Sequence, residues 1–385
     1  MKILKITSVF FPAIGWGGPI PATYDLAKKL VENNCQVRVF TSNAYDYKKN
    51  MRIENKVENG LTIQYFNNWS KGLMYFFTPG MISALFRYSK KFDVIHIHSY
   101  RQFQDMISFL ILCILRKPFV LTSHGYILPQ GKGILYKKTY DFFIGKRLLC
   151  SAKKIIAFNE KQFLEYQKMG VKKDNIRIIP NTVNIEKLPE KNLFKKKLNI
   201  SPRNKIVLYL GRINEEKGVG NLIEAFSRIT NNNVHLILAG PDYNFMDKAK
   251  KMVKKFNIEK KTHFTGLLNK ENKLKAISDA DVMVYPSLHE AGISYVILEA
   301  AAACKPLIIS ENIGFAEEVK KYHAGIVLPP TNIEKLSSSI EFLLDNHAEA
   351  IKMGLNAFKV VKEKFTWDSI IKDYLDVYEE VMKAY

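Results

Sequence analysis

The sequence has few cysteines and no long apolar run. Its 385 residues include four cysteines, which lie far apart: Cys35, Cys113, Cys150 and Cys304. This spacing argues against a clustered zinc site and is typical of a protein from a reducing, cytoplasmic compartment. The apolar run at Met106–Leu115 is about half of the roughly 20 residues that a membrane span needs. Lys5 and Pro12 interrupt the apolar N-terminal segment, so we expect neither a signal peptide nor a transmembrane helix.

Acidic residues are scarce in the first half of the chain. Residues 1–190 contain 29 Lys or Arg and 13 Asp or Glu, residues 191–385 contain 29 and 24, and the whole chain carries a net charge of +21. The asymmetry indicates either that the first half faces an anionic partner or that the source proteome is rich in lysine. Because the chain is this long and has no internal repeat or low-complexity segment, we expect two globular domains.

Glycines follow the first apolar strand. The pattern predicts a strand at Ile3–Phe10, a turn that contains Gly17 and Gly18, and a helix at Tyr24–Leu30. A strand, a glycine-rich turn and a helix open a nucleotide-binding βαβ unit, and glycine lets the backbone approach a phosphate closely. Tight turns need glycine in any case, so the pattern leaves a purely structural role open.

Histidines mark the ends of two later strands. His96 and His98 lie on one face of the predicted strand Asp93–His98, and His124 follows the predicted strand Phe119–Thr122. Sheets of α/β proteins bind ligands at the carboxyl ends of their strands. We therefore interpret His96 as a core residue, His98 as a weak site candidate and His124 as an active-site candidate.

A basic segment follows at residues 130–154. It interleaves aromatic and aliphatic side chains with seven cations: Lys132, Lys137, Lys138, Lys146, Arg147, Lys153 and Lys154. This composition is typical of an amphipathic helix that lies on an anionic surface. We therefore expect reversible docking on an anionic membrane surface, with acceptor contacts made by the basic first domain.

Two cations lie between a strand and a helix in the second half. The predicted strand Lys205–Leu210 leads to Arg212 and Lys217, each next to a glycine, and a helix is predicted at Asn221–Ile229. Arginine binds phosphate oxygens in a bidentate manner and lysine adds a point charge, so this turn suits a diphosphate. The alternative is a pair of solvated loop cations.

A glycine-containing turn flanked by carboxylates joins a strand at Asp281–Val284 to an alanine-rich helix that begins after Ser294. The free N–H groups and the dipole at a helix start favour anions. Glu299 lies about one turn into this helix, near the same turn. If the N–H groups bind a phosphate and the Glu299 carboxylate binds a diol, the ligand would be a sugar nucleotide. The alternative is a capped core helix with a surface glutamate.

These residues resemble the retaining GT-B glycosyltransferases of family 4 (glycosyl transferases group 1). Pro286-Ser287, Glu290, Gly292 and Glu299-Ala300 occupy the places of that family's Pro-Ser, first glutamate, glycine turn and second Glu-Ala. The family spaces its two glutamates eight positions apart, but here they are nine apart. Either the turn holds one extra residue or the first glutamate has an altered role.

The resemblance implies a set of site residues. Its catalytic positions are Arg212, Lys217, His124 and Glu290. Its donor-binding positions are Gly17, Gly18, Gly266, Leu267, Gly292, Ile293 and Glu299. In the family, the two cations stabilise the departing diphosphate, the first glutamate and the histidine address the transferred sugar, and the second glutamate holds the ribose.

We also expect that no metal cofactor is required, because the sequence shows no clustered ligand set and the two cations offer the charge that a metal would supply. Asp279 and Asp281 resemble the metal-binding Asp-x-Asp of other glycosyltransferases, but they lie between a helix end and a buried strand, away from the glycine turns. We therefore interpret both as structural. In the family the leaving phosphate helps to deprotonate the acceptor on the same face, so no enzymic nucleophile is needed, and the two cations stabilise the developing charge.

The implied fold is α/β, with two Rossmann-like domains facing a central cleft. We expect an acceptor-side domain at 1–188, a nucleotide-sugar domain at 189–366 and a terminal helix at 367–385 that crosses back. The implied reaction moves a sugar from a nucleotide diphosphate to a membrane-associated, lipid-linked or glycan acceptor, in the synthesis of a cell-surface polysaccharide or glycolipid. The enzyme is expected in the cytoplasm, peripheral on the inner face of the cell membrane.

Two alternatives stay open. A nucleotide-sugar epimerase can share this architecture, and it would turn over its soluble substrate without an acceptor. The basic first half also permits a nucleic-acid-binding protein, although the sequence contains no recognition motif of the common families.

Overall fold

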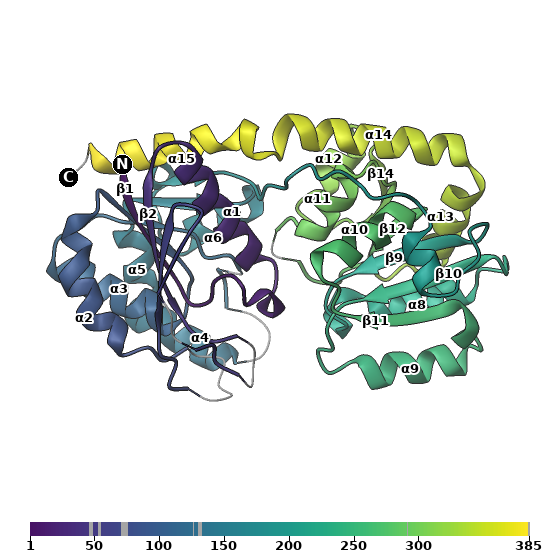
Figure 1. Ribbon diagram of the computed structural model, residues 1–385, viewed down its shortest axis with the longest axis horizontal. Helices are drawn as coiled ribbons and strands as arrows, with labels where there is room; N and C mark the ends of the chain where they lie inside the picture. The colour runs from purple at the N-terminus through teal and green to yellow at the C-terminus, as the bar shows by residue number, and fades with distance from the viewer. Residues whose placement is uncertain are drawn as a thin grey trace. The chain divides into compact units, whose positions relative to one another are not determined.

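The structure, a computed structural model, divides into two units. It describes residues 1–45, 49–52, 55–70, 76–125, 127–129, 133–290 and 292–383. The first unit contains Met1–Pro180 and Ile370–Tyr385, and the second contains Asn181–Ser369 (Figure 1). Asn181 and Val183 belong to the second unit because Asn181 Nδ2 donates to Ile293 O (2.9 Å) and Val183 N donates to Phe365 O (2.8 Å). The contacts thus divide the chain at residue 180, earlier than the boundary of 188 expected from the sequence.

The first unit is built on an eight-stranded sheet with the strand order β3-β4-β2-β1-β5-β6-β7-β8. All neighbouring strands are parallel except β3 and β4. The strands are β1 (Lys2–Thr7), β2 (Gln36–Ser42), β3 (Lys56–Glu58), β4 (Leu61–Phe66), β5 (Val94–His98), β6 (Val120–Leu121), β7 (Lys154–Ala157) and β8 (Ile176–Ile178). The chain moves from β1 to one side of the sheet and returns to the other side with β5. Such a switch point is where α/β sheets bind ligands, at the carboxyl ends of the strands.

Helices connect the strands of the first unit. They are α1 (Pro19–Glu32), α2 (Gly80–Tyr88), α3 (Phe103–Ile114), α4 (Ile134–Tyr140), α5 (Lys146–Ser151) and α6 (Glu160–Lys168). The last helix, α15 (Trp367–Met382), begins in the second unit and runs into the first. The buried Tyr378 on α15 packs against β5, where its hydroxyl lies 2.8 Å from His96 Nδ1. The C-terminal segment therefore completes the core of the first unit.

The second unit has a six-stranded, fully parallel sheet in the order β11-β10-β9-β12-β13-β14. Its strands are β9 (Lys205–Leu210), β10 (Val234–Ala239), β11 (Thr262–Gly266), β12 (Val282–Tyr285), β13 (Leu307–Ser310) and β14 (Gly325–Leu328). Its helices are α7 (Leu193–Lys197), α8 (Val219–Ser227), α9 (Met246–Lys255), α10 (Lys270–Asp279), α11 (Tyr295–Ala302), α12 (Ala316–Lys321), α13 (Ile333–Asp345) and α14 (His347–Lys364). Here the switch point lies between β9 and β12, and these are the strands that precede the predicted cations and the carboxylate turn.

Two parallel-sheet units with connecting helices confirm the predicted Rossmann-like architecture. Two of the predicted boundaries were wrong. The first strand ends at Thr7 instead of Phe10, and the helix after it starts at Pro19 instead of Tyr24, because proline is well tolerated in the first turn of a helix.

Candidate active site

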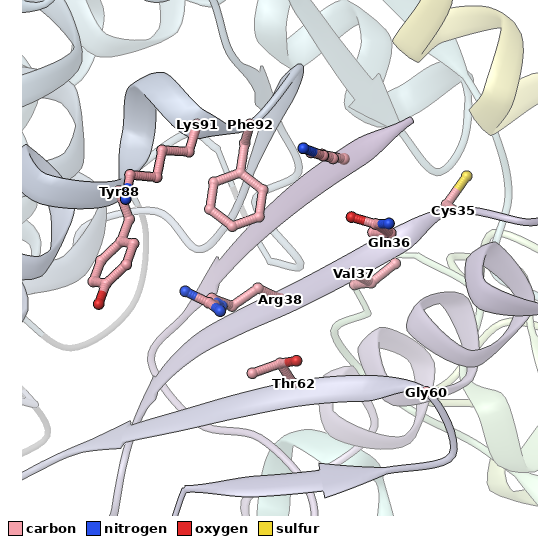
Figure 2. A pocket seen from close by; sticks show the side chains of 10 residues that line it. Cys35, Gln36, Val37, Arg38, Gly60, Thr62, Tyr88, Lys91 and Phe92 are labelled. Atoms are coloured by element: carbon pink, nitrogen blue, oxygen red, sulfur yellow. The ribbon is translucent and has the colours of Figure 1, made fainter.

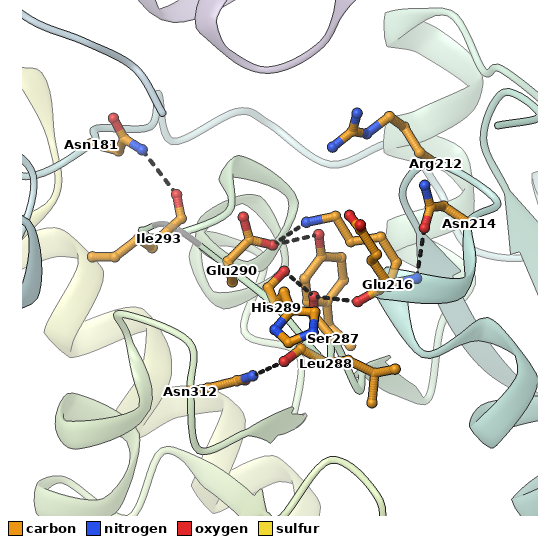
Figure 3. Close-up of polar contacts among 12 residues, drawn as sticks. Asn181, Arg212, Asn214, Glu216, Ser287, Leu288, His289, Glu290, Ile293 and Asn312 are labelled. Carbon is orange, nitrogen blue, oxygen red and sulfur yellow. Dashed lines mark hydrogen bonds and ion pairs between the residues drawn. The ribbon is translucent and has the colours of Figure 1, made fainter. Parts of the chain in front are cut away.

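Two loops meet at the switch point of the second unit. The loop after β9 contains a short helical turn at Glu215–Lys217, and the loop after β12 begins at Pro286. Leu288 N and His289 N both donate to Glu216 O, at 2.8 and 3.3 Å, and the buried Ser287 hydroxyl contacts the same carbonyl (3.3 Å; Figure 3). These bonds fix the two loops against each other although 71 positions separate Glu216 and Ser287.

Gly218 allows this close approach. Its φ of +69° lies in the left-handed region, and a Cβ added here would lie 2.0 Å from Pro286 O. No larger residue fits without moving one of the loops. The glycine after the predicted lysine is therefore a steric requirement of the loop contact.

Lys217 and Glu290 form an ion pair between these loops. Lys217 Nζ lies 2.6 Å from Glu290 Oε2, and the two side chains are 10% and 16% exposed. The Tyr285 hydroxyl donates to the same carboxylate oxygen at 3.0 Å. The ring of Tyr285 stacks on Tyr209, with the centroids 5.8 Å apart and an interplanar angle of 8°. Burial and the Glu290 carboxylate raise the pKa of Tyr285 well above its usual value, so this hydroxyl remains a donor.

Arg212 lies on the same loop but outside this ion pair. Its carbonyl accepts from the Tyr209 hydroxyl (2.8 Å), and its exposed guanidinium lies 4.8 Å from the ring centroid of Tyr243. It has no carboxylate partner among the described residues. Figure 3 shows its side chain extending clear of the hydrogen-bonded network. Arg212 is thus open to an anionic ligand, while Lys217 is held by a carboxylate.

Glu299 lies about one turn into α11, as the sequence predicted. Its Oε1 forms an ion pair with Lys273 of α10, and its Oε2 is buried without a hydrogen-bond partner among the described residues. An unpaired buried carboxylate oxygen has a strong need for a donor. A ligand hydroxyl would satisfy it.

The turn before α11 is fixed by backbone contacts. Gly292 O accepts from Gly314 N (3.2 Å), and the buried Ile293 accepts from Asn181 at its carbonyl. The Tyr295 hydroxyl donates to Asn181 Oδ1 (2.8 Å), so the linker residue Asn181 braces the start of the helix. Position 291, which bears on the nine-residue spacing of the two glutamates, lies outside the described residues.

Two of the predicted donor-binding residues, Gly266 and Leu267, lie at the end of β11. Gly266 has a φ of +67° with no atom within 4 Å of an added Cβ, and the side chain of Leu267 is 54% exposed. This open backbone contrasts with the crowded Gly218.

Asp279 and Asp281 are structural, as predicted. Asp279 accepts from the backbone N–H groups of Asn192 (2.5 Å), Phe194 (2.8 Å) and Lys195 (2.9 Å), and Asp281 accepts from Ile206 N (2.7 Å). Their oxygens are therefore committed to the start of α7 and to β9. No group of three His, Cys, Asp or Glu side chains that could hold a metal occurs within the part of the chain that the structure describes.

The first unit brings three histidines together at the carboxyl ends of β5 and β6. His96 contacts the Tyr378 hydroxyl and Thr122 Oγ1, each at 2.8 Å, as expected of a core residue. His98 Nδ1 lies 3.0 Å from His124 Nε2. His124 has a φ of +55°, which is uncommon for a residue with a side chain. Burial and, for each ring, the nearby Lys5 lower the pKa of all three histidines, to about 3 for His124.

Gly17 and Gly18 lie between β1 and α1. Gly17 has a φ of +110° and ends a short helical turn at Ile14–Trp16, and Gly18 precedes the first residue of α1. Both glycines thus lie at the switch point of the first sheet, beside the amino end of a 14-residue helix.

The predicted basic helix forms α4 and α5, which a π-helical turn at Asp141–Gly145 joins. The buried Asp141 anchors this turn: it accepts from the Tyr100 hydroxyl (2.7 Å) and from Arg101 Nε (3.0 Å) and Nη2 (2.6 Å). A π-helical turn carries one extra residue, which rotates the helix. Large apolar side chains remain exposed on the outer side, among them Leu135 (76%) and Phe142 (74%). Lys132 lies outside the described residues.

A cavity of about 430 Å³ lies in the first unit, far along the strands from these histidines. Lys2 and Gln36, which line it, are the first residues of β1 and β2, and its lining also includes Arg38, Tyr88 and Phe92 (Figure 2). It therefore lies at the amino ends of the strands. It contains none of the predicted site residues.

Several partners of the predicted residues were not predicted from the sequence. Tyr285 and Lys273 each contact a site carboxylate, and Tyr243 lies beneath Arg212. Only Tyr285 carried a signal, because it is the last residue of a buried strand that leads into the site. Lys273 lies in the middle of an ordinary polar helix, and its sequence context resembles any surface position.

Two family models match successive parts of the chain. The model described as Glycosyltransferase Family 4 matches residues 16–187, and that described as Glycosyl transferases group 1 matches residues 190–360. Together they cover both units.

Similar proteins include both curated relatives and solved structures. An uncharacterized glycosyltransferase of Methanocaldococcus jannaschii is 26% identical over 400 residues, which cover 100% of this chain and 99% of the relative. The N,N'-diacetylbacillosaminyl-diphospho-undecaprenol alpha-1,3-N-acetylgalactosaminyltransferase of Campylobacter jejuni is 25% identical over 259 residues, 65% of this chain and 64% of that protein. The crystal structure of Anabaena HepE in complex with UDP and glucose superimposes with a TM-score of 0.81 at 17% identity, covering 98% and 99% of the two chains. The motifs, the two-unit fold and these matches agree, and the chain belongs to the GT-B glycosyltransferases of the family 4 type.

Proposed function

We propose that this glycosyltransferase moves a sugar, with retention, from a nucleoside diphosphate to a lipid-linked or glycan acceptor at a membrane surface, in cell-surface polysaccharide or glycolipid synthesis. The observation that carries the proposal is the arrangement at the switch point of the second unit. There, the exposed Arg212 lies on the same loop as Lys217, which is held by Glu290 across 73 positions of sequence.

The donor diphosphate binds at the two cations. A diphosphate carries more negative charge than one carboxylate, so it competes with Glu290 for Lys217. Glu290 is then released toward the transferred sugar, and Arg212 provides bidentate contacts to the phosphate oxygens. As the glycosidic bond breaks, the charge that develops on the leaving phosphate is stabilised by both cations. The leaving phosphate accepts the acceptor proton on the same face, which gives retention without an enzymic nucleophile.

Other predicted residues orient the donor. The unpaired Oε2 of Glu299 accepts from a ribose hydroxyl, and the base lies against the backbone at Gly266 and Leu267. In the first unit, His124 contacts the transferred sugar and the backbone at Gly17 and Gly18 contacts the diphosphate. These roles follow from the family resemblance, together with the positions of these residues at strand ends.

The donor class is tested by a thermal-shift screen with UDP, GDP and ADP and their sugars. A ligand that binds only the folded protein raises its stability by about 2.7 kcal/mol at a concentration 100 times its Kd. We expect a UDP sugar to give the largest shift, because HepE binds UDP and glucose. Product analysis with and without a glycan acceptor then separates transfer from epimerisation.

The reaction requires no divalent metal in this proposal, because the two cations provide the charge that a metal would supply. Turnover should survive EDTA unchanged. Loss of turnover in EDTA that manganese or magnesium restores would contradict the proposal.

The acceptor side of the proposal rests on the surface of α4 and α5. Exposed aromatic and aliphatic side chains stand there among the exposed cations Lys138, Lys146 and Arg147. This combination suits the interface of an anionic membrane, where each cation contributes about 1 kcal/mol. The Campylobacter jejuni relative is named for a diphospho-undecaprenol acceptor, a lipid, which agrees with this choice. Among the described residues, every helix is too short or too polar to cross a bilayer.

Liposome sedimentation tests the docking surface. Binding to anionic liposomes should fall as salt rises, and reversing the charge of Lys137, Lys138, Lys146 and Arg147 to glutamate should abolish it while nucleotide binding persists. The matched control reverses the charge of four exposed lysines on α9 of the second unit: Lys250, Lys251, Lys254 and Lys255. If both variants lose liposome binding equally, binding depends on the net charge of the protein and not on the surface of α4 and α5. If the wild-type protein binds no liposome, a soluble acceptor is favoured.

A further inference from the structure

Two histidines meet at the carboxyl ends of neighbouring strands in the first unit. His98 is the last residue of β5, and His124 follows β6. His98 Nδ1 lies 3.0 Å from His124 Nε2, and the ring centroids are 5.3 Å apart at an interplanar angle of 28°. His98 itself is buried and packs against His96, with the ring centroids 3.7 Å apart at an interplanar angle of 36°. The orientation of the His124 ring is thus set by a side chain that is itself held in place.

We propose that His98 is a positioning residue that holds the His124 ring so that Nδ1, carrying the proton, faces the transferred sugar. The proposal rests on the role of His124 in the proposed function. His124 Nε2 is occupied by His98, and the structure gives Nδ1 no partner among the described residues. Nδ1 is therefore the ring nitrogen that remains for a ligand.

The position of the proton follows from the unpaired nitrogen of His98. Burial and the nearby Lys5 lower the pKa of both histidines, so each ring carries one proton at neutral pH. His98 Nε2 is buried without a hydrogen-bond partner among the described residues. If His124 donated to His98, the His98 proton would lie on this buried nitrogen and form an orphaned N–H, which folded proteins rarely tolerate.

The reverse arrangement avoids the orphaned N–H. His98 Nδ1–H donates to His124 Nε2, and His124 then carries its proton on Nδ1. His124 consequently donates a hydrogen bond to an oxygen of the sugar and does not act as a general base. The left-handed backbone of His124 is consistent with a functionally constrained position.

Ring-nitrogen NMR of the protein labelled with ¹⁵N-histidine tests the proton position directly, since protonated and unprotonated ring nitrogens have well-separated shifts. The chain has eight histidines, and a spectrum of His124→Gln assigns the signal. We expect His124 to be protonated at Nδ1 in the wild type. His98→Leu should remove that preference, whereas His98→Asn, whose side-chain amide can donate from a similar place, should retain it.

Kinetics provide a second readout, with UDP-glucose as the probe and release of UDP as the signal. His98→Leu should lower kcat by about tenfold, the loss expected for one hydrogen bond, with little change in the affinity for UDP. His98→Asn should recover most of kcat. Tyr378→Phe is the matched control, because it removes a buried hydrogen bond of 2.8 Å from His96 without contacting His124.

The possible outcomes are distinct. Protonation of His124 at Nε2 in the wild type, or an unchanged His124 spectrum in His98→Leu, would overturn the inference. If the protein turns over no nucleotide sugar, the proposed function fails, but the NMR result still decides the role of His98. If His98→Leu does not fold, the wild-type and His98→Asn spectra decide it.

Discussion

The two units hold their candidate site residues by opposite electrostatic means. In the second unit, Lys217 forms an ion pair with Glu290, so a cation and a carboxylate face each other. In the first unit, the partners that the described residues offer to four buried nitrogen bases are hydroxyl, carbonyl or imidazole groups; the four are Lys5, His96, His98 and His124. Burial without a carboxylate favours their neutral forms. The second unit therefore offers fixed charges to a ligand, while the first offers neutral hydrogen-bonding groups.

The net charges of the two units show the reverse contrast, because the first unit, whose site groups are neutral, carries the larger net charge. The first unit contains 30 Lys or Arg and 15 Asp or Glu, for a net charge of +15, and the second contains 28 and 22, for +6. The positive charge of the first unit thus lies on its surface and not at its histidine cluster. We therefore expect the surface of the first unit to bind an anionic membrane surface. We expect its buried histidine cluster to contact a neutral sugar.

The largest expected difference between the units is their response to acid. The pKa values of His96, His98 and His124 are lowered below 6.5 in the folded state, so the unfolded state binds protons first as the pH falls. Their contribution to stability is complete above pH 6.5 and is lost from there toward pH 3. The loss is about 1.4 kcal/mol per histidine per pH unit, or about 4 kcal/mol in total for the three histidines at pH 5.5.

Hydrogen exchange at pH 7.5 and 5.5, corrected for the intrinsic rates, measures this effect. Peptides from β5 and β6 should lose protection more than peptides from β9 and β12. The half-exposed pair His235 and His263 in the second unit has a smaller shift of the same sign. Equal losses of protection in the two units would contradict the proposed electrostatic difference between them.

Two glycines of the second unit that have nearly the same backbone φ should respond differently to substitution. Gly218→Ala places a Cβ 2.0 Å from Pro286 O, whereas Gly266→Ala places one where no atom lies within 4 Å. Both variants have the strain of a left-handed residue, about 1 kcal/mol, and only the first must also move the loop. Urea denaturation should therefore give a loss of about 3 kcal/mol for Gly218→Ala and about 1 kcal/mol for Gly266→Ala. Similar losses would mean that the two loops separate easily.

Arg212→Ala tests whether the fixed charges of the second unit act on the transition state. Because the guanidinium has no carboxylate partner among the described residues, its loss should leave stability unchanged and lower kcat about 100-fold, with a smaller effect on the KM for donor. Arg228→Ala, which removes the exposed arginine at the C-cap of α8 that pairs with Glu224, is the control. An increase in KM alone would make Arg212 a ground-state anchor.

Glu299→Gln gives the smallest expected effect. It weakens a charge-assisted hydrogen bond to the ribose, so the donor should bind less tightly by about 2 kcal/mol while the protein stays folded. Calorimetric titration with the nucleotide measures the loss, and Glu271→Gln, which breaks a surface pair with Lys275 on α10, is the control. Unchanged nucleotide affinity in Glu299→Gln would remove this residue from the site.

Local patterns in the sequence were sufficient to place the predicted residues on strand ends and helix starts. Apolar runs identify buried parallel strands, and glycines after them mark the turns, because each depends on residues that are close in sequence. For that reason Arg212, Lys217, His124 and Glu299 could be selected as candidates. The Asp279 and Asp281 pair could be interpreted as structural because it lies between a helix end and a buried strand, away from the glycine turns.

What each selected residue contacts was decided by the tertiary structure. Lys217 reaches Glu290, and His96 reaches Tyr378 across 282 positions, because the strand order brings loops and a terminal helix together that are remote in the chain. The burial that keeps the histidines neutral has the same origin. The sequence by itself determined which groups stand at the carboxyl ends of the strands. Only the folded sheet determined which of them are paired and charged and which are buried and neutral, since both depend on neighbours that no local pattern specifies.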